Sequence, residues 1–259
     1  MRLLILLFFL FSCKISQAQC VTPLSNTQSK EKIDWMELES FNPSAYNNPE
    51  VIQILKLENG VDGDVNRDYY SVTIDKLPEM TLNKFFDTFR KALTKSIFKD
   101  NKNYSLEPYS NIDKIKWDNG RLGAIMTFTL GAIYVNDIFN NPLISSEFNR
   151  LEFENGDVVL SCIDSESFIF STVRTKKNGY HPVSGNRGFG VAENSEGRWI
   201  IYTKGVDRVS SYPLNLLIPD ETIFQLGNNV WQGLLNNISE IYKSQNPSDR
   251  VENSNRYKD

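Results

Sequence analysis

The chain has 259 residues, of which 40% are hydrophobic and 12% aromatic, and it carries a net charge of -4. A chain of this length and composition can build a substantial core, and it still falls within the single-domain range once a signal peptide is removed. The acidic balance argues against nucleic acid as a partner, because a surface that binds the phosphate backbone needs clustered lysine and arginine.

The chain begins with the pattern of an export signal. Arg2 is followed by an uninterrupted apolar run over residues 3–11 and then by small and polar residues, as in a signal peptide. The run is too short to span a bilayer as a helix, which takes about 20 residues, and no later segment is long enough either. We therefore expect export to the periplasm, cell envelope or exterior of a bacterium, without a transmembrane helix.

Two processing sites are compatible with this sequence. Cleavage after Ala18 would remove residues 1–18 as the signal peptide, whereas the segment ending at Cys13 is similar to a bacterial lipobox and would make Cys13 a lipid anchor. Soluble export would leave Cys20 and Cys162 in a compartment where a disulfide can persist. Cys162 lies in an apolar run, so a buried free thiol is the alternative.

Three regions follow the signal peptide. Residues 19–60 are rich in asparagine, serine and charge, which predicts a partly ordered N-terminal extension. Residues 61–245 carry the periodic patterns of a single α+β domain. Residues 246–259 hold one large aliphatic side chain, Val251, and we expect a disordered tail.

Within the domain, the expected elements are a strand, a helix, a series of strands and a long final helix. Residues 69–75 alternate as in a strand, and apolar residues three or four apart over 81–98 predict a helix with Thr81 as its N-cap. β-Prone runs separated by turn signals then predict an antiparallel meander. These runs are 122–130, 133–138, 148–153, 158–163, 168–174, 187–192 and 198–206. Residues 221–244 carry one apolar stripe and predict the last helix.

A long helix with one apolar face must pack on a large surface, and the sheet is the surface available. The expected fold is α+β, a curved antiparallel sheet of about six or seven strands gripped by the C-terminal helix, with a second helix after the first strand. This order of elements over residues 69–243 resembles the START-like, helix-grip (SRPBCC-type) superfamily. Residues 168–190, with His181-Pro182, Gly185 and Phe189, also resemble the His-Pro-x-x-Gly-x-x-x-Phe motif of a small family in it. The resemblance implies a ligand cavity between sheet and helix, and supplies no catalytic residues.

Residues 180–208 are the most unusual part of the chain, because charged residues and glycines interrupt β-prone runs there. A turn centred on residues 195–197 would pair residue 189 with 203 and residue 191 with 201, and alternation then assigns each side chain to a face. One face would carry Arg187, Phe189, Val191, Trp199, Ile201, Thr203 and Asp207. The other would carry Asn186, Gly188, Gly190, Ala192, Ile200, Tyr202, Lys204 and Arg208.

Arg187 and Asp207 would then lie diagonally on a mostly apolar face, within reach of each other. Two interpretations stay open, a structural clamp at the end of the sheet or a polar wall of a cavity, since a desolvated ion pair is weak evidence for stability. On the other face, Gly188 and Gly190 leave a gap that a helix, an aromatic ring or a ligand would fill.

These patterns favour a module that binds an apolar or amphipathic small molecule such as a lipid. The candidate ligand-binding residues are Arg187, Phe189, Trp199, Tyr202, Asp207, Arg208 and Trp231. One alternative is an exported hydrolase-type enzyme that uses His181 with Asp207 or Ser184. Another is an envelope scaffold that recognises a protein through residues 180–190. We expect no metal and no cofactor, because one histidine without a cysteine cluster disfavours zinc and the glycines do not form a nucleotide loop.

Overall fold

The computed structural model describes residues 20–21, 35–43, 48–60, 64–97, 105–129, 132–134, 150–152, 155–210, 220–242 and 250–257. The predicted signal peptide and Cys13 lie outside these residues. Within them, no helix has the length and apolar character needed to cross a membrane.

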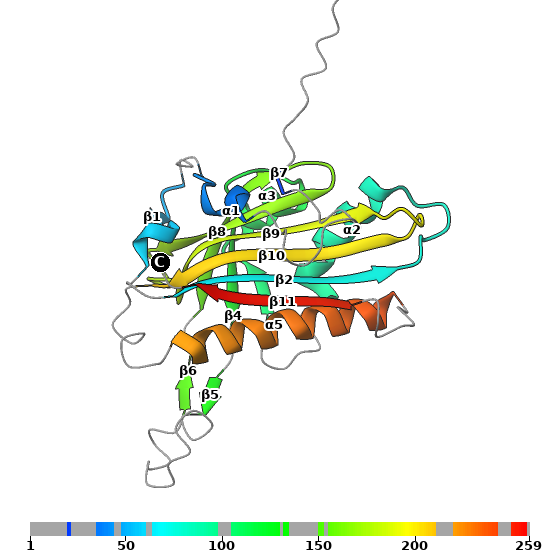
Figure 1. Ribbon diagram of the computed structural model, residues 1–259. Coiled ribbons are helices and arrows are strands. Elements are labelled where there is room, and N and C mark those ends of the chain that lie inside the picture. Colours follow the sequence, from blue (N-terminus) through cyan, green and yellow to red (C-terminus); the bar gives the residue numbers. More distant parts are fainter. Residues whose placement is uncertain are drawn as a thin grey trace, which may run out of the picture.

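A nine-stranded antiparallel sheet forms the body of the described structure (Figure 1). Its strands follow the order β11-β2-β10-β9-β8-β7-β4-β3, and β1 pairs with β8 beside this path. The strands are β1 (Val51–Ile54), β2 (Val65–Ile74), β3 (Ser105–Pro108), β4 (Ile125–Thr129), β7 (Gly156–Ile163), β8 (Ser167–Thr175), β9 (Val183–Glu193), β10 (Trp199–Val209) and β11 (Arg250–Tyr257). A separate pair, β5 (Ala132–Tyr134) and β6 (Arg150–Glu152), completes the described strands.

The longest helix, α5 (Asp220–Ile241), runs along one side of the curved sheet (Figure 1). The helix α2 (Leu82–Ala92) follows β2 and continues as a π-helical turn over Leu93–Ile97. As predicted, the Thr81 side chain caps α2 by accepting a hydrogen bond from the backbone of Lys84. The expected α+β fold, a curved antiparallel sheet with a C-terminal helix, is confirmed.

Several elements were not predicted, among them the strands β1 and β3, and one prediction was wrong. The short helices α1 (Met36–Glu39) and α3 (Asn111–Asp118) lie in segments that show no clear helical periodicity. Residues 250–257, expected in a disordered tail, form β11 along the edge of β2. An unpaired strand edge presents a row of free backbone donors and acceptors, so even a polar segment can gain order by pairing with it.

Both faces of the sheet are covered. The inner face carries an aromatic-rich core together with α2 and α5, and Phe168, Phe170, Phe189 and Trp231 belong to it. On the outer face, Val21 packs over Gly188, and the Tyr202 hydroxyl donates a 3.0 Å hydrogen bond to the Val21 carbonyl. A disulfide between Cys20 and Cys162 holds this N-terminal segment on β7.

Candidate functional site

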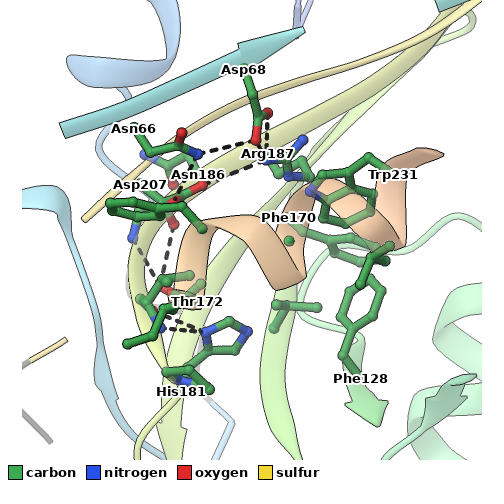
Figure 2. A pocket seen from close by; sticks show the side chains of 18 of the residues that line it. Asn66, Asp68, Phe128, Phe170, Thr172, His181, Asn186, Arg187, Asp207 and Trp231 are labelled. Atoms are coloured by element: carbon green, nitrogen blue, oxygen red, sulfur yellow. Dashed lines mark hydrogen bonds and ion pairs between the residues drawn. The ribbon is translucent and has the colours of Figure 1, made fainter. Parts of the chain in front are cut away.

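A cavity of about 110 Å³ lies between the inner face of the sheet and α5. Most of its wall is apolar, with a polar cluster on one side (Figure 2). The lining residues are Asn66, Asp68, Phe128, Val158, Phe170, Thr172, His181, Pro182, Val183, Gly185, Asn186, Arg187, Phe189, Asp207, Ile223, Phe224, Gly227, Val230 and Trp231.

The hairpin β9–β10 has the register expected from the sequence. Thr203 pairs with Phe189, and Ile201 pairs with Val191. The two predicted faces are therefore correct. Arg187 and Asp207 lie on the inner face, in the wall of the cavity, and the ion pair expected between them is present with 3.5 Å between Nη2 and Oδ2.

The strongest partner of Arg187 is a residue that sequence reasoning missed. Arg187 Nη2 lies 2.6 Å from Asp68 Oδ1 and donates to Asp68 Oδ2 at 2.8 Å, from β9 across β10 to β2. The guanidinium carbon lies 4.0 Å from the ring centre of Trp231, a cation–π contact with α5 (Figure 2). Nη1 also donates a long hydrogen bond to Thr203 at 3.4 Å. The guanidinium thus has partners on β2, β10 and α5.

Gly205 makes this arrangement possible. It is the residue of β10 that pairs with Arg187 on one side and with Asp68 on the other. A Cβ added at Gly205 would overlap the Arg187 guanidinium and lie 2.8 Å from Asp68 Oδ1. The glycine therefore leaves a slot across the middle strand through which the Arg187 side chain reaches Asp68.

Asp207 and Asn66 are less well paired than Asp68. Asp207 accepts a 3.4 Å hydrogen bond from Asn66 Nδ2, which also donates to Asp68 at 3.1 Å. Burial, and then the charge of Asp68, raise the pKa of Asp207 to about 7, although Arg187 opposes the shift. Among the described residues, Asn66 Oδ1 has no hydrogen-bond partner, and Asn66 is only 2% exposed.

His181 lies in the cavity wall, but its contacts do not form a catalytic arrangement. Its Nδ1 lies 3.1 Å from the backbone nitrogen of Val183 and 3.0 Å from the Val183 carbonyl oxygen. Burial lowers the pKa of His181 to about 4, so the ring is neutral at pH 7. In the part of the chain that the structure describes, His181 makes no hydrogen bond to Asp207, and the buried Ser184 hydroxyl has no hydrogen-bond partner.

Four of the seven candidate ligand-binding residues line the cavity: Arg187, Phe189, Asp207 and Trp231. Trp199 shares their face but lies in the core against Phe85, with 4.7 Å between ring centres. Tyr202 and Arg208 are on the opposite face, as their alternation predicts, and so lie outside the cavity wall. The Tyr202 ring fills the space beside Gly190, which was one of the interpretations of that gap.

Across the described ranges, no group of three or more histidine, cysteine, aspartate and glutamate side chains is placed to hold a metal ion.

No protein-family model and no curated protein sequence matches the chain. Solved structures with a similar arrangement include Ara h 8.0201, at 13% identity and a TM-score of 0.41, covering 70% of this chain and 99% of that one. Ginseng major latex-like protein 151 from Panax ginseng matches at 11% identity with a TM-score of 0.38, and the match covers 70% of this chain and 99% of that one. A START superfamily protein from Mycobacterium smegmatis matches at 7% identity with a TM-score of 0.38, and the match covers 71% of this chain and 100% of that one.

Proposed function

We propose that this chain is an exported module that binds an apolar or amphipathic small molecule between the sheet and α5. The observation that carries the proposal is the cavity, because closely packed interiors ordinarily leave few voids larger than a water molecule. Aromatic side chains line it, as they do in small-molecule sites, and a few polar groups converge on one side.

Gly227 strengthens this interpretation. It lies in the interior of α5 and lines the cavity, and the nearest atom to an added Cβ would be Trp231 Nε1 at 3.8 Å, an ordinary contact. A glycine in a helix costs roughly 1 kcal/mol relative to alanine. Since a methyl group would fit here, the missing side chain keeps space open at the expense of stability.

The volume sets the scale of the ligand. A cavity of about 110 Å³ is somewhat smaller than an engineered cavity of about 150 Å³ that binds benzene. It is also below the roughly 300–1,000 Å³ of sites that enclose drug-sized ligands. A single ring or a short alkyl segment is the part of a ligand that fits, and a longer molecule would extend beyond the cavity.

Export is supported by two observations that agree. The first residues have the charge, apolar run and small residues of a signal peptide. Cys20, two residues after the proposed cleavage at Ala18, is joined to Cys162, and such disulfides persist in oxidising compartments. We propose a periplasmic, cell-envelope or extracellular location, with lipidation at Cys13 as the alternative to release.

Toluene is a suitable probe of the cavity, and its binding can be measured by shifts in the protein NMR spectrum. We expect saturable binding that Gly227→Leu abolishes, because the leucine side chain would occupy the cavity. Asn229→Leu is the matched control, since it adds the same side chain to an exposed position of α5. Absence of saturable binding to the wild-type protein, or equal binding to the Gly227→Leu variant, would contradict the proposal.

A further inference from the structure

We infer that the polar group of the ligand is a hydrogen-bond donor, best a protonated amine, that binds Asp207, rather than an anion that binds Arg187. This inference rests on the proposed function and specifies the ligand class for the same cavity. An arginine beside an apolar cavity would ordinarily indicate a carboxylate or phosphate ligand, so the contacts of each polar group decide the matter.

Arg187 is already occupied. Its guanidinium contacts both oxygens of Asp68, at 2.6 and 2.8 Å, and stacks on Trp231 at 4.0 Å. An anionic ligand would have to compete with Asp68, whose side chain is 1% exposed. Displacement would leave that carboxylate buried without its counter-charge, which is strongly unfavourable. The arginine therefore serves as part of the wall.

The open position beside it is an acceptor, the carboxylate of Asp207, whose side chain is 13% exposed and lines the cavity. The contacts of Asp207 to Asn66 and Arg187, at 3.4 and 3.5 Å, are both long. A buried carboxylate with only long contacts is poorly compensated, and a ligand N–H or O–H group beside Asp207 would supply a closer donor.

The charges around Asp207 agree with a cationic donor. Asp68 on β2 and Asp207 on β10 face one guanidinium, Arg187 on β9, which leaves one negative charge in excess when both carboxyls are ionised. His181, the other titratable group in the wall, is neutral at pH 7 because burial lowers its pKa. The cavity-lining residues of α5, namely Ile223, Phe224, Gly227, Val230 and Trp231, carry no charge.

Three probes with the same ring separate the alternatives: toluene, benzylamine and benzoate, titrated into the full-length protein by calorimetry at pH 7.5. We expect benzylamine to bind at least tenfold more tightly than toluene, and benzoate more weakly than toluene. Because Asp207 has a pKa near 7 in the free protein, benzylamine affinity should fall more than tenfold between pH 7.5 and 5.5. Toluene affinity should not change.

Asp207→Asn should remove the preference for benzylamine and its pH dependence while toluene binding stays, which shows that the cavity is intact. If toluene binds and the affinity for benzoate equals or exceeds the affinity for benzylamine, the inference is overturned and the proposed function stands. Failure of all three probes to bind would overturn both. The head-group order and the pH dependence are measured on the wild-type protein, so the test does not depend on the variant folding.

Discussion

Alanine at Gly205 should destabilise this protein, although the same exchange inside a strand is ordinarily favourable by roughly 0.5–1 kcal/mol. The added Cβ would overlap the guanidinium of Arg187 and crowd Asp68 Oδ1. To relieve the overlap, the guanidinium must leave Asp68, which is 1% exposed. Removing one partner of a buried ion pair costs about 3–5 kcal/mol. The net loss in the free energy of unfolding should therefore be about 2–4 kcal/mol.

Urea denaturation followed by tryptophan fluorescence measures this loss, provided that the slope of the transition is unchanged. A double-mutant cycle with Arg187→Met isolates the cause, because Gly205→Ala should cost less than about 1 kcal/mol once the guanidinium is absent. Gly227→Ala is the control for a glycine with space beside it and should be neutral or stabilising. Additive effects of Gly205→Ala and Arg187→Met would refute the proposed slot.

Gly190→Ala should cost about 1–3 kcal/mol in urea denaturation, because the added methyl overlaps the ring of Tyr202; an unchanged midpoint would contradict this packing. Serine at both Cys20 and Cys162 should cost about 2–5 kcal/mol, since their disulfide spans 142 residues, and reduced wild-type protein should unfold at the same urea concentration as this variant. The pKa of Asp207, about 7, exceeds its unfolded value of about 3.9, so its protonation stabilises the native state at low pH. Relative to Asp207→Asn, wild-type stability should fall by up to about 4 kcal/mol from pH 4 to 7; a constant difference would refute the shift.

Local sequence patterns were enough to predict the hairpin β9–β10 in detail. The turn at residues 195–197 and period-two alternation determine which side chains share a face, and the register of Phe189 with Thr203 follows from them. For the same reason the approach of Arg187 to Asp207 could be predicted. All of this depends on residues close together in the chain.

The position of Asp68 could not be predicted in this way. It comes beside Arg187 because β2 pairs with β10, a contact between segments far apart in the sequence. Alternation in β2 predicts that Asp68 shares a face with Tyr70, but no local signal says which strand lies next to it. On α5, Trp231 was predicted to line the cavity and does so. Gly227 was missed, because a glycine in a helical pattern indicates only a weaker helix.

The glycines of this fold differ in whether another side chain fills the space beside them. Beside several glycines, the space that a Cβ would take is filled by a side chain from another segment: Val21 at Gly188, Tyr202 at Gly190, His181 at Gly156 and Arg187 at Gly205. At these positions the missing Cβ serves packing, and an alanine would have to displace a neighbour. At Gly227 the space beside the backbone is not filled, and this glycine borders the cavity. A packing role does not account for it, whereas room for a ligand does.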